Sequence, residues 1–429
     1  MLFVLALVLR GALYHIITPD YTMFVSQWYD FIRTHGGFAA MQYNFSNYNP
    51  PYLYLIALAT YLPIPKLIAL KSISVVFDVV LALFTYLILR LKYPRSYLPM
   101  VGATVMLFTP TVFLNSAAWG QCDAIYASFC LGSLYFLLKR RWGWACVFFG
   151  LAIAFKLQAI FFLPVLLLIV LKRALPVRYL ALIPAVFLLL LAPALLAGRD
   201  VRSLLSVYVE QTSTGGIGGG TRAFGNGGAA AAGATGLPRF DPGNRQPFNG
   251  AGSRPSRPAA GFGQAARGGF GGRNSFSSLT YNAPTIYQWF AGTPLAQNKW
   301  VGIALAALVV ALVGGLLLAS KTRVTSDLVL HISLVCVLAI PFLLPDMHER
   351  YFFLADVVSI VFAFYFPRAF YIPIIMQLAS LLSYAPYLFN AEPVRLAYVS
   401  FAVLGITLVA AAKLVRRATH DPTYIPNHF

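Results

Sequence analysis

Acidic residues are scarce in this 429-residue chain, and so are charged residues of any kind. Asp and Glu together number 13, and all charged residues make up only 10% of the sequence. Soluble domains carry about a quarter charged residues, so this composition excludes an ordinary water-soluble protein. Hydrophobic residues reach 59% and recur in long runs along the chain. The sequence therefore predicts an all-α integral membrane protein, a polytopic bundle of transmembrane helices.

Cysteine and the motifs of cofactor sites are equally scarce. Cys122, Cys130, Cys146 and Cys336 lie in or beside apolar segments and lack the spacing of metal ligands. We interpret them as small apolar residues within helices. The chain has no phosphate-binding glycine loop, no nucleophile elbow and no His-Glu-x-x-His motif. The pattern therefore indicates neither a nucleotide-binding loop nor a zinc site.

Lys and Arg number 32 and give a net charge of +19, but their placement does not favour a nucleic-acid partner. Most lie in short clusters between apolar runs, such as 139–141 and 413–417. Such clusters orient membrane proteins, because basic connections stay in the cytoplasm. Every second connection is basic, so we predict cytoplasmic termini in a plasma or inner membrane and an external face formed by the other loops.

A membrane span needs about 20 apolar residues unless its helix is broken. Residues 143–171 suffice for one span but have basic clusters at both ends, so we predict two short helices that turn near residues 155–158. The first apolar run is interpreted as a retained span and not as a signal peptide. Roughly twelve crossings result. They are expected near 1–17, 69–90, 97–114, 118–138, 143–155, 159–171, 179–198, 299–320, 326–344, 351–366, 370–389 and 396–412.

Two long loops organise the chain into an N-terminal module, 1–198, and a C-terminal module, 299–429. The first outer loop, 18–68, has aromatic residues at helical spacing and predicts an amphipathic helix at the membrane interface. Its apolar stretch 52–63 predicts a second interfacial or re-entrant helix, with a full span as the alternative.

The second long loop, 199–298, is external on this pattern, and Gly, Ala, Ser, Pro and Arg dominate its residues 211–280. Such a segment cannot bury enough apolar surface to offset its chain entropy, so we predict disorder at 211–280 and order again near Tyr281. With seven Arg against one Asp, the segment could attract anionic lipid or polymer, but a spacer is the favoured interpretation.

The few acidic residues near the external face can be weighed individually. Asp20 follows the first span, and it is either the N-cap of the next helix or a general base toward a hydroxyl nucleophile. Asp30 lies ten residues further on and fits a solvated charge on that helix. Asp123 stands beside Gln121 and is a candidate for lining a cavity.

The cations of the same face suggest an anion site. Lys156 lies at the predicted turn with Gln158 close by, and His348, Glu349 and Arg350 stand together between two apolar runs. Polar residues at a membrane edge are costly unless they have a task. A phosphate leaving group requires positive charge, which Arg can offer bidentately. The alternative is an interfacial charge cluster with an internal ion pair.

Taken in chain order, these residues resemble the motifs of the GT-C class of glycosyltransferases. The resemblance is closest to enzymes that use polyprenyl-phosphate sugars, related to the dolichyl-phosphate-glucose:oligosaccharide glucosyltransferases and the bacterial membrane mannosyltransferases. The matching elements are Asp20, Tyr48-Asn49-Pro50-Pro51-Tyr52-Leu53, Gly120-Gln121-Cys122-Asp123, Phe155-Lys156-Leu157-Gln158 and His348-Glu349-Arg350. The resemblance excludes the glycine-rich loop and the last two expected spans. It also departs from the family, because Asp20 lacks a preceding Gly and its nearest carboxylate is Asp30.

The resemblance implies a GT-C-like bundle that transfers a hexose, mannose or glucose, with inversion from a polyprenyl-phosphate-sugar donor to a hydroxyl of a glycan, glycolipid or protein. It implies that Asp20 is the catalytic base, that His348, Arg350 and Lys156 bind the donor phosphate, and that no metal or other cofactor is needed. The remaining candidates for lining the site are Asp30, Tyr48, Pro51, Gln121, Asp123, Gln158 and Glu349.

Two other classes compete with this interpretation. A transporter or lipid flippase usually has internal repeats with broken helices paired between its halves. The first outer loop, 18–68, has no counterpart in the second half of this chain, which disfavours that class. A structural membrane-assembly subunit would not need a carboxylate and several cations on one face of the membrane.

Overall fold

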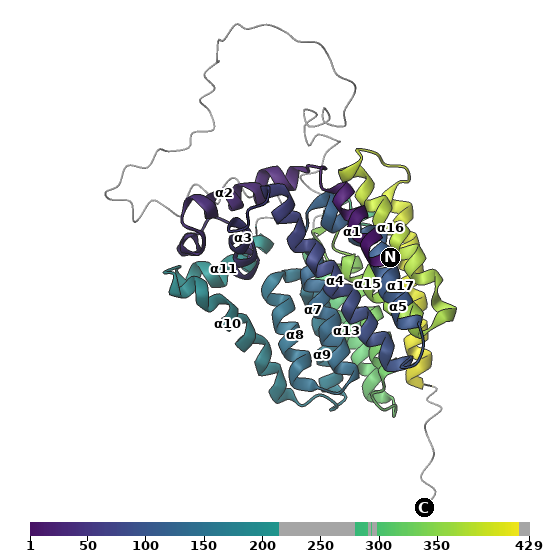
Figure 1. Ribbon diagram of the computed structural model, residues 1–429. Helices are drawn as coiled ribbons and strands as arrows, with labels where there is room; N and C mark the ends of the chain where they lie inside the picture. The colour runs from purple at the N-terminus through teal and green to yellow at the C-terminus, as the bar shows by residue number, and fades with distance from the viewer. Residues whose placement is uncertain (214–278, 291–292, 294–297, 420–429) are drawn as a thin grey trace, which may run out of the picture. The chain divides into compact units, whose positions relative to one another are not determined.

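The computed structural model describes residues 1–213, 279–290, 293 and 298–419, and these belong to one compact unit (Figure 1). Most of the segment predicted to be disordered, 211–280, lies outside the described residues. The described chain is almost entirely helical, and its one sheet is a pair of two-residue strands. It is therefore an all-α protein, as the composition predicts.

The N-terminal helices run in chain order through the first part of the unit. They are α1 (Leu2–Leu13), α2 (Ser26–Thr34), α3 (Pro50–Thr60), α4 (Lys66–Lys92), α5 (Leu98–Phe108), α6 (Pro110–Phe113), α7 (Asp123–Leu138), α8 (Trp142–Phe155), α9 (Leu163–Leu171), α10 (Leu182–Leu196) and α11 (Val201–Ser213). Short π-helical turns cover Tyr21–Val25 and Leu114–Trp119, and 3-10 turns cover Gly37–Gln42, Leu157–Phe162 and Val177–Ala181.

The C-terminal part contributes five helices that pack on the first set (Figure 1). They are α13 (Lys299–Ala319), α14 (Ser326–Leu343), α15 (Phe353–Tyr365), α16 (Tyr371–Leu388) and α17 (Leu396–Thr419). Single 3-10 turns cover Ile286–Trp289 and Pro367–Ala369. Caps fix the starts of two of these helices, because Asn298 accepts a hydrogen bond from Trp300 N and Thr325 accepts one from Leu328 N.

Each of the twelve expected spans coincides with a helical segment, but the number of crossings is not supported. Six helices of the described chain are long and apolar enough to cross a membrane, and a seventh span results if α5 and α6 count as one helix bent by 48°. Five shorter apolar helices, among them α7, α8 and α15, do not meet that length. The predicted pair of short helices in 143–171 is present, because the extended residue Lys156 separates α8 from the helical segment that contains α9, and Pro110 begins α6 after the bend that follows α5. The chain is thus a multi-pass membrane protein with fewer long spans than predicted.

Burial separates the helices into central and peripheral ones. α14 is 83% buried inside the bundle, because its apolar residues face neighbours on every side. α10 and α13 are only 11% and 22% buried, although they are among the most apolar helices. A helix with apolar residues on all faces and few protein neighbours is suited to contact with lipid.

The first outer loop folds as the sequence predicts, into helices at both expected places. The π-helical turn Tyr21–Val25 continues into α2, and α3 begins at Pro50, whose fixed φ suits a first helical position. Trp28 of α2 packs against Tyr48 with ring centroids 5.2 Å apart, which closes the loop on itself. The location of both helices at a membrane interface stays a prediction.

A parallel strand pair brings the segment after the long loop onto the start of the α14–α15 connection. Thr280–Tyr281 (β1) pairs with Met347–His348 (β2), and Asp346 N donates to Leu279 O at 2.8 Å. The Tyr281 ring stacks on the His348 ring at 4.6 Å. The segment near Tyr281 is therefore joined to the connection that carries His348, Glu349 and Arg350.

Candidate active site

Asp20 lies at the end of the segment that follows α1, and its carboxylate points into the protein. It is only 7% exposed, and its Oδ2 accepts hydrogen bonds from Trp119 Nε1 at 3.0 Å and from Gln121 Nε2. Its side chain makes no hydrogen bond to the following helical turn. The N-cap interpretation of Asp20 is therefore wrong, because the carboxylate is used in a tertiary contact.

The donors to Asp20 come from a sharp turn between α6 and α7. A π-helical turn ends at Trp119, and Gly120 then adopts a left-handed conformation with φ +78°, which a residue with a side chain rarely adopts. This reversal directs the side chains of both flanking residues, Trp119 and Gln121, toward Asp20. Thr18 Oγ1 donates to Trp119 O at 3.0 Å and ties the turn to the segment that carries Asp20.

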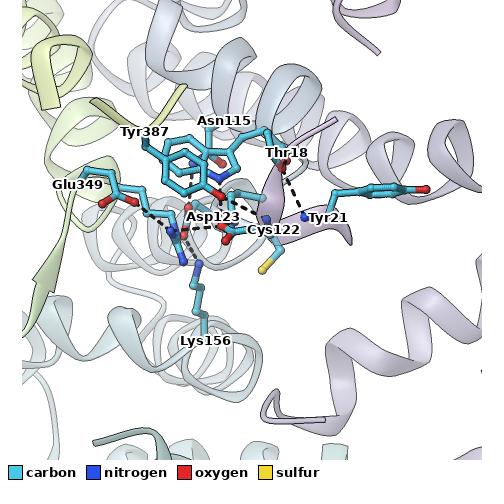
Figure 2. Close-up of polar contacts among 12 residues, drawn as sticks. Thr18, Tyr21, Asn115, Cys122, Asp123, Lys156, Glu349 and Tyr387 are labelled. Carbon is cyan, nitrogen blue, oxygen red and sulfur yellow. Dashed lines mark hydrogen bonds and ion pairs between the residues drawn. The ribbon is translucent and has the colours of Figure 1, made fainter. Parts of the chain in front are cut away.

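Arg350 brings the C-terminal half of the chain to the same carboxylate. Its Nη1 lies 3.6 Å from Asp20 Oδ2 and 3.1 Å from Glu349 Oε1. The guanidinium also lies over the Trp119 ring, 5.6 Å from the centroid. Figure 2 shows labelled side chains from both halves of the chain, Glu349 and Tyr387 with Asp123 and Lys156, around this cluster of polar contacts. Two residues 330 positions apart in the sequence therefore lie in contact.

Lys156 and Asp123 form a second buried pair beside the first. Lys156 Nζ donates to Asp123 Oδ1, and Asn115 Nδ2 donates to Asp123 Oδ2 at 2.8 Å (Figure 2). Asp123 is fully buried and Lys156 is 6% exposed. The charge of Lys156 is thus balanced by a carboxylate in this structure, and an added anion would have to share it.

Burial changes the protonation of the two residues that precede Arg350. It raises the pKa of the Glu349 carboxyl to about 7, although the neighbouring Arg350 acts in the opposite direction. It lowers the pKa of His348 well below the usual value, and the positive charges of Arg350 and Lys156 act in the same direction. His348 is therefore neutral at pH 7, and Glu349 is a much weaker acid than a solvated carboxyl. The positive charge of the cluster resides on Arg350 and Lys156.

The helix α16 supplies residues that the sequence did not indicate. The Tyr387 ring stacks on Trp119 with centroids 4.4 Å apart, and Tyr387 Oη accepts a hydrogen bond from Asp20 N at 3.1 Å. Tyr384 meets the same indole edge-on at 5.3 Å. The one available signal was a pair of tyrosines at i and i+3 near the predicted external end of α16. Asn115 was missed in the same way, as a lone amide in an apolar run.

The other expected lining residues differ in how close they come to this cluster. Tyr48 Oη lies 3.8 Å from the Sγ of Cys122, the neighbour of Asp123, and Pro51 is buried one residue into α3. Gln158 is partly buried, and its Oε1 has no hydrogen-bond partner among the described residues.

Asp30 is not brought into this cluster. Its exposed carboxylate pairs with Lys66 Nζ at 2.7 Å. This fits the solvated helix charge expected for Asp30.

The cluster offers no ready-made metal site. Across the described ranges, no three His, Cys, Asp or Glu side chains lie where they could hold a metal ion together. The four cysteines are all free and buried, in agreement with their interpretation as small apolar residues.

Comparison with known families gives one match. Residues 45–238 match the model of Glycosyltransferase family 87. The matched range is less than half of the chain, and it includes Gln121, Asp123 and Lys156 but neither Asp20 nor Arg350. No curated protein matches the chain.

The family match and the helical bundle point to the same class of protein. The match supports a membrane glycosyltransferase of the GT-C type, and the apolar helices make it a multi-pass membrane protein.

Proposed function

We propose that this protein transfers a hexose, mannose or glucose, from a polyprenyl-phosphate-sugar donor to a hydroxyl acceptor, with inversion at the anomeric carbon. The observation that carries the proposal is the contact of Asp20 with Arg350, next to Lys156 (Figure 2). The glycosyltransferase family match, which covers Lys156 but neither Asp20 nor Arg350, supports it. A carboxylate for the acceptor proton and cations for a leaving phosphate are the two groups that such a transfer needs.

Asp20 is suited to act on the acceptor because its carboxylate is fixed through one oxygen. Trp119, Gln121 and Arg350 all contact Oδ2. In the proposed step, Oδ1 takes the proton of the acceptor hydroxyl while the acceptor oxygen forms a bond to the anomeric carbon. The bond from that carbon to the phosphate oxygen breaks, and its electron pair leaves with the lipid phosphate.

Arg350 is the favoured partner for the departing phosphate. Its Nε is buried and has no hydrogen-bond partner in the described part of the chain, so one donor of the guanidinium is unused. Burial raises the pKa of Glu349 to about 7, so Asp20 is the main carboxylate that balances Arg350, and release of Asp20 frees that charge for the phosphate. Neutral His348 can contribute a hydrogen bond but no charge. Lys156 can contribute charge only by sharing it with Asp123.

The donor must change the contact that the structure shows. In inverting glycosidases the two carboxyls stand about 6.5–9.5 Å apart, which leaves room for the attacking water beside the sugar. Asp20 Oδ2 and Arg350 Nη1 are 3.6 Å apart, which is too close for a sugar to lie between those atoms. We therefore expect the donor phosphate to draw Arg350 away from Asp20, so that the base is released when the donor binds.

The remaining parts of the proposal concern location and requirements. We propose an active site at the external face of a plasma or inner membrane, both termini in the cytoplasm, and a glycan, glycolipid or protein hydroxyl as acceptor. On this topology the five shorter apolar helices also cross or enter the membrane, giving up to about twelve crossings. We expect no metal requirement, because Arg350 and Lys156 supply the charge that a metal would otherwise supply. Retention of activity in EDTA would check this expectation.

The topology has a direct test. In a cysteine-free background, a membrane-impermeant thiol reagent should label a cysteine at position 250 in intact cells and should not label one at position 140. Labelling at position 140 would place the basic connections outside and would remove the external assignment of the site.

The decisive experiment measures transfer. Purified protein in nanodiscs is incubated with polyprenyl-phosphate-mannose or polyprenyl-phosphate-glucose, and release of lipid phosphate is measured with and without cell-envelope acceptors. We expect acceptor-dependent release with one of the two donors, and at least about 10²-fold slower release with the Asp20→Asn variant. Movement of intact donor across the bilayer without release would instead indicate a flippase and would contradict the proposal.

A further inference from the structure

Lys71 is a buried cation that the proposed reaction does not use. It lies near the start of α4 and is 1% exposed. Its Nζ lies 2.6 Å from Ile16 O, 3.0 Å from Ala118 O, 3.1 Å from Tyr14 O and 3.4 Å from Leu13 O. An ammonium has three N–H donors, so these four main-chain oxygens are enough to accept all of its hydrogen bonds.

The partners of Lys71 are unusual for a buried charge. No ion pair among the described residues includes Lys71, so its charge is met by carbonyl dipoles alone. Burial of a charge is expensive unless it is fully hydrogen-bonded, so such an arrangement persists only where the surrounding backbone is held in place. The ammonium thus crosslinks two chain segments that do not otherwise belong to one helix.

Both segments lead directly into the proposed site. Ile16 is four residues before Asp20, and Ala118 is the residue before Trp119, which donates to Asp20. The Lys71 side chain also lies beside the left-handed turn at Gly120. A Cβ added to Gly120 would be in van der Waals contact with Lys71 Cγ, at 3.6 Å. Lys71 therefore joins the segment that carries the proposed base to the turn that orients it.

We propose that Lys71 is a positioning residue, which fixes the distance between Asp20 and its donors Trp119 and Gln121. This inference rests on the proposed function, because it assigns Lys71 a purpose in the geometry of that base. Lys71 does not itself reach the reacting groups. Its effect on turnover comes through the backbone at 13–16 and 118, and a displacement of about 1 Å at a reacting group can cost on the order of 10²-fold in rate.

The test compares Lys71→Met with a matched control, Lys172→Met. Lys172 Nζ also donates only to main-chain carbonyls, those of Leu317 and Ser320 at 2.9 Å, which lie at the C-terminal end of α13 and belong to no residue of the candidate site. For the protein that folds, we expect Lys71→Met to lower kcat by at least about tenfold while KM for the donor changes by less than about threefold. Lys172→Met should keep the wild-type kcat, and Lys71→Arg should restore part of it.

A double variant separates positioning from general stability. If Lys71 acts through Asp20, adding Lys71→Met to Asp20→Asn should cause little further loss, because coupled residues are not additive. If Lys71 only stabilises the fold, the two losses should multiply, and that result would overturn the inference.

Hydrogen exchange provides a readout that does not depend on turnover. In Lys71→Met, peptides covering 13–22 and 116–122 should exchange faster, while α13 and α14 should be unchanged. Faster exchange with unchanged kcat would show a structural staple and would overturn the positioning role. If wild-type protein released no lipid phosphate with any donor, the proposed function would fail by itself. Unchanged exchange at 13–22 and 116–122 would then overturn the crosslink as well.

Discussion

Replacement of Asp20 by Asn tests the proposed chemistry with minimal change in structure. The amide has the size of the carboxylate, and its single oxygen can take the place of Oδ2, where it still accepts hydrogen bonds from Trp119 and Gln121. Its NH₂ group then occupies the place of Oδ1 and cannot accept the acceptor proton. The variant therefore removes the base while keeping the geometry of the turn around Gly120.

The expected magnitude follows from the single interaction that is lost. General base catalysis contributes about 10²–10⁴-fold, which corresponds to roughly 3–5 kcal/mol of transition-state stabilisation. Donor binding should be no weaker than in the wild type, since Asn removes a negative charge 3.6 Å from the Arg350 guanidinium and so removes a competitor for it. The loss should therefore fall on kcat and leave the donor affinity intact.

The assay is single-turnover release of lipid phosphate at saturating donor, with donor affinity measured separately in nanodiscs. Asp30→Asn is the matched control, because Asp30 is an exposed Asp of the same loop that pairs with Lys66. An exposed ion pair contributes only about 0–1 kcal/mol, so this variant should keep near-normal turnover. Near-normal turnover in Asp20→Asn would refute the assignment of the base, and an equal loss in both variants would indicate a general effect on the loop.

Further predictions concern Arg350, Lys156 and the pH dependence of donor binding. Arg350→Ala should weaken donor binding as well as turnover, because it removes the guanidinium with the unused buried Nε, and equilibrium donor binding measures this. Lys156→Ala should also weaken donor binding. It should lower the melting temperature as well, because it leaves the fully buried Asp123 without its cation, at a cost of about 3–5 kcal/mol. Unchanged donor binding in Lys156→Ala would remove Lys156 from the phosphate site. Donor affinity should fall as the pH rises through about 7, since the pKa of Glu349 is raised to about 7 and its ionised form competes for Arg350. Glu349→Gln should flatten that profile, and an unchanged profile would contradict the role of Glu349.

The sequence by itself determined the class of protein and the positions of its helices. The spans expected at 299–320 and 326–344 form α13 (Lys299–Ala319) and α14 (Ser326–Leu343), because long apolar runs separated by Lys321 and Arg323 leave few other solutions. It also singled out the charged residues that meet at the candidate site, since a charge at the edge of an apolar helix is costly and therefore conspicuous.

Only the tertiary structure decided which groups touch. Asp20 and Arg350 are distant in sequence, and their contact depends on the packing of α1, α15 and α16 around the turn at Trp119. Tyr387 escaped notice because tyrosine is ordinary at a membrane edge, and its partner, the amide of Asp20, carries no sequence signal. The tertiary structure alone also decided that Lys156 pairs with Asp123 and that Lys71 donates to main-chain carbonyls. Sequence reports which residues are costly to bury, whereas the packed helices fix the distances at which those residues compensate one another.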